Sequence, residues 1–301
     1  KLAVGKSRFV LMTDQAGVIT DDGVACRFSG EHFYVTATTS GVDAVYRSML
    51  QWNAQWRLDV DVANVTAAYA GVNIAGPKSR AVLQKVCQDI DLSAEAFPYL
   101  GVRGGTVAGI PARLLRVGFV GELGYEIHVP YGYGEALWDA LMDAGAPEGI
   151  RPFGVEAQRV LRMEKGHIIV SQDTDGLTNV WEADMPWALA KTKPFFVGGR
   201  STAIMAKMPL LRKLDGFTLD DPTLPCPEEC QLVIRNGEIF GRVPSAVHSP
   251  SVGKVVGLAY VHPDDAAPDS KIHIKIDGGR MIEGRVVKLP FYDPEGKRQE
   301  M

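Results

Sequence analysis

The sequence predicts an α+β protein with two domains, in which a mixed region of helices and strands precedes a small all-β domain. The length of 301 residues is about twice that of an average domain. Helix-type and strand-type patterns alternate over residues 1–210, whereas residues 211–301 hold mainly short strand patterns separated by turns. Hydrophobic residues make up 46% of the chain and charged residues 23%, as in globular rather than disordered proteins.

The first region is predicted from its periodicity. Aromatic and β-branched runs indicate strands, and apolar residues spaced three and four apart indicate helices. The predicted strands cover residues 7–12, 31–37, 66–75 and 112–120, and residues 121–129 are predicted as a turn that leads into a strand. The predicted helices cover residues 42–57, 134–144 and 154–165, with one more after Pro77. The stripe of the helix 42–57, which we expect to pack into the core, consists of Val45, Met49, Trp52 and Trp56.

Turn residues divide the rest of the chain. Gly17 and Asp21-Asp22-Gly23 indicate turns between the first two strands, and Asn236-Gly237 indicates a hairpin. The strands predicted in the second region cover residues 213–219, 231–235, 239–243, 254–261, 271–276 and 281–289. Regularly spaced short strands are typical of a small barrel or sandwich. We therefore predict one domain over residues 1–210 and a second over residues 211–301.

Charge and hydropathy exclude two classes of function. With 32 Lys and Arg against 36 Asp and Glu, the net charge is −4, without the basic excess typical of nucleic-acid binding. No apolar run reaches the ~18 residues of a membrane-spanning helix, and the first twelve residues do not form a signal peptide. We expect a cytoplasmic protein that binds neither nucleic acid nor membrane.

The four cysteines predict neither a disulfide scaffold nor a metal site. They are scattered along the chain, and only Cys226 and Cys230 stand close together, as a C-x3-C. A zinc site needs further ligands at short spacing, and the histidines of this region do not stand in a paired motif. We expect the protein to bind no metal.

Familiar catalytic motifs are absent from the sequence. It contains no Walker loop, HExxH, GxSxG or GxGxxG after a strand, which argues against nucleotide-fuelled enzymes, zinc hydrolases, serine hydrolases and Rossmann dehydrogenases. Three acidic groups remain as candidate sites: Asp21 with Asp22, Glu122 with Glu126 in GELGYE, and Glu164 with Asp173 and Asp175 in RMEKGHIIVSQDTDG.

Each acidic group has a structural and a functional interpretation. Neighbouring carboxylates on a strand point to opposite faces, so only one of Asp21 and Asp22 would enter a given site. The glycines of GELGYE let a ligand approach the backbone, and a glutamate there can accept two hydrogen bonds from a planar, guanidine-like ring. Judged by residue type alone, solvated turns and salt bridges are the commoner outcome for all three groups.

Seven segments, in order along the chain, resemble the aminomethyltransferase family, which includes the T-protein of the glycine cleavage system. The first five are residues 5–24, 75–80, 118–130, 159–176 and 193–201. The terminal domain adds HSPSVGKVVGLAYV at 248–261 and LPFYDPEGKRQ at 289–299. A single segment would be a weak match, but this ordered series covers nearly the whole chain.

Within the family, MEKGHIIVSQDTDG and FYDPEGKRQ most resemble the folate-binding half of sarcosine oxidase alpha subunits. That branch carries flavin-enzyme domains before this half. The family's opening segment is missing here and the chain begins at Lys1, so we expect a piece of a longer subunit. The resemblance implies a three-lobed folate-binding fold, with its first lobe incomplete, over residues 1–210 and a C-terminal β-barrel over residues 211–301.

The resemblance also implies roles for individual residues. Asp22 matches the family's aspartate beside the reactive nitrogens of tetrahydrofolate, where a carboxylate can orient the amine, accept a proton or stabilise positive charge. Glu126 matches the glutamate that holds the pterin edge through two hydrogen bonds, which singles it out over Glu122. Arg162 matches an arginine for which we expect a structural role.

Further residues are expected to bind the folate: Phe119, Thr36, Tyr125 and Gln158. Phe119 replaces a tyrosine beside the pterin, which removes a hydroxyl contact and keeps the stacking. Thr36 and Gln158 replace an asparagine and an arginine of the T-protein. Two more departures from the family's pattern are Met185-Pro186-Trp187 and Gly199, the latter in place of a lysine.

The function implied by the resemblance is one-carbon transfer to tetrahydrofolate. Flavin-containing domains or subunits of a hetero-oligomeric sarcosine oxidase would oxidise an N-methyl amine, and this region would trap the one-carbon unit as 5,10-methylenetetrahydrofolate before water reaches it. We expect no flavin or NAD in this chain. Two alternatives stay open: a stand-alone glycine cleavage aminomethyltransferase that docks a lipoyl carrier protein, and a non-catalytic folate-binding or assembly domain.

Overall fold

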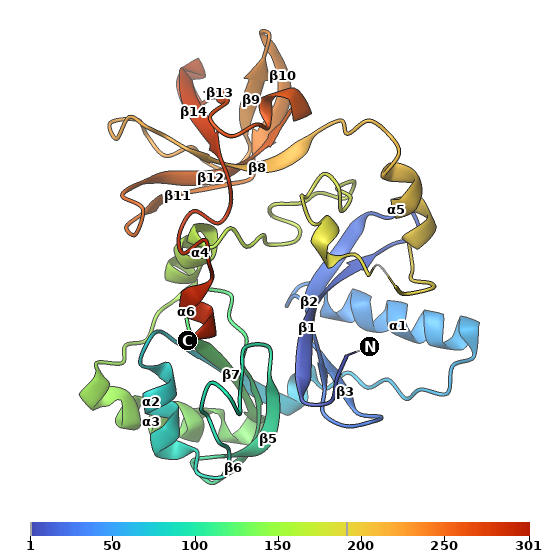
Figure 1. The fold of residues 1–301 in the computed structure, drawn as a ribbon, viewed down its shortest axis with the longest axis vertical. Helices are drawn as coiled ribbons and strands as arrows, with labels where there is room; N and C mark the ends of the chain where they lie inside the picture. Colours follow the sequence, from blue (N-terminus) through green and yellow to red (C-terminus); the bar gives the residue numbers. More distant parts are fainter. Residues whose placement is uncertain (1, 191) are drawn as a thin grey trace. The chain divides into compact units, whose positions relative to one another are not determined.

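The computed structural model describes residues 2–190 and 192–301, which divide into two compact units. The first unit contains the chain up to Val10, then Gly23–Gly154 and Gly296–Met301, and the second contains Leu11–Asp22 and Val155–Glu295. Figure 1 shows the order of the elements along the chain. The domains predicted on either side of residue 210 divide the chain differently from these two compact units. That boundary stays a prediction.

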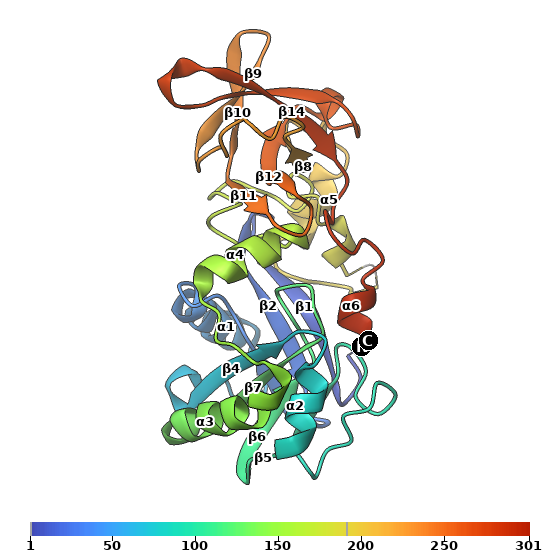
Figure 2. The same cartoon turned by 90° about the vertical axis from the view of Figure 1, so that its left-hand side faces the viewer.

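A four-stranded antiparallel sheet with the order β4-β7-β6-β5 forms the centre of the first unit. Its strands are β4 (Tyr69–Ala75), β5 (Val102–Val107), β6 (Ile110–Leu115) and β7 (Gly124–Pro130). Helices α2 (Ser79–Val86) and α3 (Gly134–Gly145) lie against one face of this sheet (Figure 2). Leu83 and Leu137 are fully buried there with Ile127 of β7, so the predicted apolar faces of both helices form this core.

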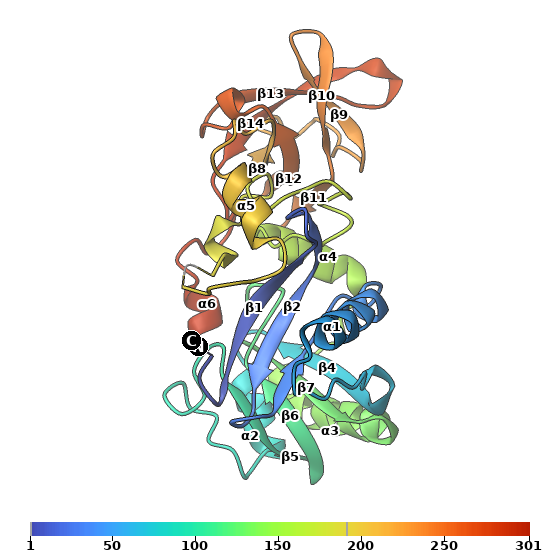
Figure 3. The same ribbon diagram turned by 90° about the vertical axis from the view of Figure 1, so that its right-hand side faces the viewer.

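A three-stranded sheet consists of β1 (Lys6–Thr13), β2 (Ile19–Arg27) and β3 (Phe33–Val35), with β1 and β2 side by side in Figure 3. The turn between β1 and β2 lies at residues 14–18, where the Asp14 N–H donates to the Val18 carbonyl at 3.0 Å. The turn predicted at Asp21-Asp22-Gly23 is wrong. These residues lie within β2, because strand pairing fixes their backbone more strongly than their turn propensity does.

Helix α1 (Val42–Trp56) matches the predicted helix in position but differs in packing. None of its residues is buried, and Trp56 is 39% exposed. The rings of Trp52 and Trp56 stack on each other with centroids 4.7 Å apart. The expectation that this apolar stripe packs into the core is therefore wrong, because none of its four residues is buried and Trp56 is exposed.

The second unit contains a seven-stranded sheet with the order β10-β9-β13-β14-β8-β12-β11. Its strands are β8 (Lys213–Thr218), β9 (Gln231–Arg235), β10 (Glu238–Val243), β11 (Ser245–Ser249), β12 (Lys254–Val261), β13 (Lys271–Lys275) and β14 (Met281–Val287). A Cβ on Gly241 of β10 would lie 2.1 Å from the carbonyl oxygen of Tyr260 in β12. This close approach curls the sheet, as the predicted barrel requires.

The described residues also form helices α4 (Val155–Glu164), α5 (Gly199–Met205) and α6 (Lys297–Glu300). Short 3-10 turns occur at Thr66–Ala68, Tyr131–Tyr133, Ala146–Glu148, Pro186–Ala188, Pro263–Asp265 and Asp277–Gly279. Among residues 2–190 and 192–301, no helix has both the length and the apolar character needed to cross a membrane.

Candidate functional site

Strand β7 carries the most informative acidic residue of the first unit. Its side chains alternate, so that Tyr125, Ile127 and Val129 are fully buried in the core below the sheet. Glu126 and His128 point to the opposite face and are half-buried, and the Glu126 side chain is 32% exposed. A carboxylate in this position remains accessible to a ligand while it is fixed by a paired strand.

The neighbouring strand β4 places no bulky side chain directly beside Glu126. Asn73 of β4 pairs with Glu126, and Gly71 pairs with His128. Both β4 residues are exposed, and a Cβ at Gly71 would come no closer than 3.8 Å to the imidazole. On the side of β4, the partners of Glu126 and His128 are therefore a polar residue and a glycine rather than bulky side chains.

Glu122, four residues earlier, has a different role. Its Oε1 accepts a hydrogen bond of 2.7 Å from Nη1 of Arg298, at the start of α6. This ion pair ties the C-terminal helix to the segment before β7. The choice of Glu126 over Glu122 as the ligand-binding carboxylate stays a prediction, and it agrees with the pairing of Glu122 and the accessibility of Glu126.

The other expected folate-binding residues of this unit lie in distinct surroundings. The Tyr125 ring packs against Phe97 with centroids 5.7 Å apart, and its hydroxyl accepts a hydrogen bond of 3.2 Å from Arg80. Tyr125 therefore faces the core, on the side of β7 opposite to Glu126. Phe119 is half-buried in the segment between β6 and β7. The Thr36 hydroxyl accepts a 3.0 Å hydrogen bond from the Val24 N–H and extends the β2–β3 pairing.

Asp22 belongs to the second unit and lies on β2. Asp21 is 1% exposed and Asp22 is half-buried, in keeping with the predicted alternation of the two side chains. Burial raises the pKa of Asp22 to about 6, and the charge of Asp21 adds to this shift. A carboxyl group with a pKa near neutrality can both take up and release a proton at working pH, as general acid–base catalysis requires.

Glycine is required directly after Asp22. A Cβ on Gly23 would lie 1.9 Å from the carbonyl oxygen of Thr36, which no side chain can tolerate without moving the strand. The close approach of the Gly23 backbone to the Thr36 carbonyl fixes the path of β2 directly after Asp21 and Asp22.

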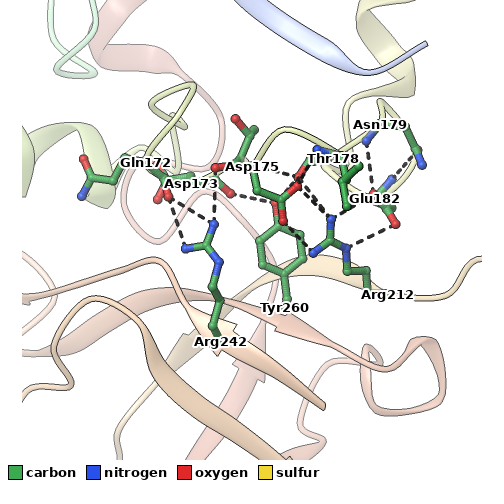
Figure 4. A network of polar contacts seen from close by, with 11 residues as sticks. Gln172, Asp173, Asp175, Thr178, Asn179, Glu182, Arg212, Arg242 and Tyr260 are labelled. Carbon is green, nitrogen blue, oxygen red and sulfur yellow. Dashed lines mark hydrogen bonds and ion pairs between the residues drawn. The ribbon is translucent and has the colours of Figure 1, made fainter. Parts of the chain in front are cut away.

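The third acidic group supports the fold of the second unit. Figure 4 shows Arg212 between Asp175 and Glu182. Arg212 donates hydrogen bonds of 2.9 and 3.1 Å to the two oxygens of Asp175 and one of 3.3 Å to Glu182. Burial opposes ionisation of Asp175, but the hydrogen bonds from Arg212, the Leu177 N–H and Thr178 outweigh it and hold its pKa well below the usual range.

This network also reaches the hairpin that carries Asp22. The Thr178 hydroxyl donates to Asp175 at 2.8 Å and contacts the Tyr260 hydroxyl at 3.0 Å. The Thr178 carbonyl accepts a 2.9 Å hydrogen bond from the Ile19 N–H, at the start of β2. The segment around Asp175 therefore anchors the strand on which Asp21 and Asp22 stand.

Helix α4 is fixed by buried charges at its C-terminal end. Arg162 is 2% exposed and forms an ion pair of 2.5 Å with the fully buried Asp173, as well as a 2.9 Å hydrogen bond to Ser245. Glu164 accepts hydrogen bonds from Ser249 and Ser251 at 2.6 and 2.9 Å. Arg162 thus has the structural environment expected for it, and Gln158 lies half-buried one turn earlier on the same helix.

The described structure thus divides the predicted site residues between the two units. Glu126, Tyr125, Phe119 and Thr36 belong to the first unit, and Asp22 and Gln158 to the second. The site predicted from the sequence does not include His128, which lies beside Glu126. It also lacks Tyr34, which contacts His128, and Arg113, which pairs with His128 in the β6–β7 ladder. The alternation of GYEIHVP could have placed His128 beside Glu126, but no sequence signal connects either residue to Tyr34. Among the described residues, no group of three or more His, Cys, Asp or Glu could hold a metal ion.

Comparison with known proteins places this fold in a family. The family model described as "GCVT N-terminal domain" matches residues 1–193, and the model "Glycine cleavage T-protein C-terminal barrel domain" matches residues 212–293. An aminomethyltransferase from Chloroherpeton thalassium is 31% identical over 96% of this chain and 78% of its own length. The chain belongs to the aminomethyltransferase family. The resemblance found in the seven sequence segments is confirmed.

Other members of the aminomethyltransferase family extend the comparison. The sarcosine oxidase subunit alpha of Corynebacterium sp. strain U-96 is 35% identical over 100% of this chain, which spans 32% of that subunit's length. The crystal structure of the glycine cleavage system aminomethyltransferase T from Bartonella henselae superposes with a TM-score of 0.84, at 22% identity, over 97% of this chain and 78% of that one. The latter match confirms the predicted fold with its C-terminal barrel.

Proposed function

We propose that this chain binds tetrahydrofolate and serves as the one-carbon transfer region of a sarcosine oxidase alpha-type subunit. The observation that carries the proposal is Glu126, a half-buried carboxylate that is 32% exposed on the sheet face opposite to the core, whereas Glu122 is paired with Arg298. The match to a sarcosine oxidase subunit alpha along the whole chain supports the choice of branch. The chain spans only about a third of that relative, so the oxidation step is assigned to flavin-containing domains or subunits of the same assembly.

The surroundings of Glu126 fit a pterin edge. A carboxylate accepts two parallel hydrogen bonds from a ring N–H and an adjacent amino group, as it does from a guanidinium. On the neighbouring strand Asn73, the partner of Glu126, and Gly71 are both exposed, and the Glu126 side chain itself is 32% exposed. In the proposed function, Glu126 fixes the orientation of the pterin ring.

Asp22 supplies the proton acceptor. Bound tetrahydrofolate supplies the nucleophilic amines that capture the methylene carbon of the imine formed from an oxidised N-methyl amine. In the protonated imine, R–NH⁺=CH2, two C–N bonds would form to that carbon while its bond to the parent nitrogen breaks. The parent amine would leave as R–NH2 with one of the two folate N–H protons, and Asp22 would accept the other. A base with a pKa of about 6 is mostly ionised at neutral pH and is well matched to this task.

A stand-alone glycine cleavage aminomethyltransferase is the second candidate. The observation in its favour is that the chain covers 78% of the length of a curated aminomethyltransferase, against 32% of the sarcosine oxidase subunit. This function requires a lipoyl carrier protein as the donor of the aminomethyl group. A chain that forms methylenetetrahydrofolate only with a charged lipoyl carrier, and not with an oxidised N-methyl amine, performs the second function.

The product of a labelled substrate separates these functions. We expect an intact flavin-containing assembly that holds this chain to convert sarcosine with a ¹³C-labelled methyl group into labelled 5,10-methylenetetrahydrofolate, even with a formaldehyde scavenger in excess. Asp22→Ala should move at least tenfold more label into the scavenger, at an unchanged rate of sarcosine oxidation, because removing one general base costs about 10²–10⁴-fold in the step it assists. NMR of the products measures the distribution.

Two outcomes of this experiment decide against the proposal. If the scavenger captures the label from the unmodified assembly as completely as from the Asp22→Ala variant, the chain does not protect the one-carbon unit. If tetrahydrofolate binds but no labelled product forms, the chain is a non-catalytic folate-binding domain, the third possibility that the sequence left open.

A further inference from the structure

Two residues of β7 share the open face of the four-stranded sheet. His128 follows Glu126 by two positions, which places both side chains on the same side of the strand. The imidazole Nε2 lies 3.5 Å from Oε2 of Glu126. The His128 side chain is 14% exposed, less than half the exposure of Glu126, so the ring lies behind the carboxylate relative to solvent.

A tyrosine from another sheet fixes the imidazole. The Tyr34 hydroxyl of β3 lies 2.8 Å from Nδ1 of His128, and the two rings meet edge to face with centroids 5.5 Å apart. Burial raises the pKa of Tyr34, so its hydroxyl keeps its proton and is able to donate to Nδ1. A neutral imidazole that accepts at Nδ1 carries its own proton on Nε2, the nitrogen that faces Glu126.

Arg113 holds this tyrosine in place. Its guanidinium carbon lies 4.7 Å from the ring centroid of Tyr34 and 4.6 Å from that of Tyr69. Arg113 stands on β6 directly opposite His128 in the β6–β7 ladder. Cation–π contacts with two rings restrict the orientation of Tyr34, and so the hydroxyl stays directed at His128.

These contacts form a chain of side chains that ends on the Glu126 carboxylate. We propose that His128 is a positioning residue that orients the Glu126 carboxylate for ligand binding, and that Tyr34 selects the His128 tautomer that does so. The inference rests on the proposed binding of tetrahydrofolate by Glu126 and assigns residues that act behind it. With Oε2 held by the imidazole, Oε1 and the outward lone pairs face the ligand, and less rotational freedom is lost when the ligand binds.

Variants of the two residues test the proposal through affinity for tetrahydrofolate, measured by titration calorimetry on the whole chain. We expect His128→Leu to raise the Kd about tenfold, because it removes the donor facing Glu126. His128→Gln should stay within about threefold of the unmodified chain, because a glutamine amide can donate to the same carboxylate. Tyr34→Phe keeps the ring on Arg113 and loses only the hydroxyl, and we expect a three- to fivefold rise in Kd.

Comparing these variants separates the positioning role of His128 from an effect on packing, and separates this inference from the proposed function. A loss of affinity in His128→Gln equal to that in His128→Leu, or unchanged affinity in all three variants, overturns the positioning role. If the unmodified chain binds tetrahydrofolate and Glu126→Gln weakens it while His128→Leu does not, the inference fails and the proposed function stands. If the unmodified chain does not bind tetrahydrofolate, both fail.

Discussion

Asp21 and Asp22 show how two adjacent carboxylates acquire different environments on one strand. Asp21 is buried and Asp22 is half-buried, with a pKa raised to about 6 by burial and by Asp21. The unfolded Asp22 carboxyl loses its proton near pH 3.8 and the folded one near pH 6. The folded state is therefore penalised as the pH rises between these values, and the full penalty is present above pH 6.

The variant Asp22→Asn removes this penalty. We expect it to raise the free energy of unfolding by about 1–2 kcal/mol at pH 7.5, which is the pKa shift converted to energy and reduced for the partial exposure of the group. At pH 4 the gain should vanish, because the folded carboxyl is then protonated. Chemical denaturation at the two pH values measures the difference. A gain in the free energy of unfolding that is equal at both pH values, or absent at pH 7.5, would show that the charge of Asp22 does not destabilise the folded state.

Part of the candidate site is predictable from the sequence at the level of single residues. Asp22 and Glu126 came from the family resemblance, and their alternation on strands came from the two-residue period. The turn assigned to Asp21-Asp22-Gly23 was wrong because Gly23 serves a close approach to the Thr36 carbonyl rather than a turn. The contact between Tyr34 of β3 and His128 of β7 joins residues far apart in the chain. Local sequence patterns do not predict such a contact.

For helices and strands, hydrophobic periodicity predicts where an element lies in the sequence better than it predicts whether the element is buried. Strand β7 and helices α2 and α3 lie where their apolar patterns predicted. Strand β5 was missed because Gly104 and Gly105 in VRGGTV suggest a turn, and pairing with β6 overrides that propensity. Helix α1 formed as predicted, yet its stripe is not buried, because periodicity shows which face is apolar and not what covers it.

Helix α4 provides a prediction at this scale. We expect Arg162→Met to lower the free energy of unfolding by about 3–5 kcal/mol, because it leaves Asp173 charged and buried without its partner. Arg159→Met, on the same helix, is the matched control, since Arg159 forms only an exposed pair with Glu156 and should cost less than about 1 kcal/mol. Thermal or denaturant unfolding compares the two. Similar losses in both variants would contradict the structural role of the buried pair.

For the molecule as a whole, the sequence predicts the fold well but does not predict how the chain divides into two compact units. The ordered family segments predicted the sheet-and-helix region and the terminal barrel, and the family models and the Bartonella henselae structure agree. The hairpin Leu11–Asp22 belongs to the same compact unit as the barrel. It is held there by Thr178 and by α5, where the Ser201 hydroxyl donates to the Gln15 carbonyl at 2.7 Å. Contacts between segments so far apart in the chain follow from packing rather than from local pattern.

Calorimetric titration with tetrahydrofolate tests the central claim, that the chain binds this ligand through Glu126. We predict that the unmodified chain binds tetrahydrofolate. Glu126→Gln should bind it at least tenfold more weakly, because a charged acceptor is lost from two hydrogen bonds. Glu122→Gln should bind it within about twofold of the unmodified chain. The last variant matches the first in chemistry and keeps an acceptor for Arg298. No binding by the unmodified chain, or equal affinities for the two variants, would contradict the account.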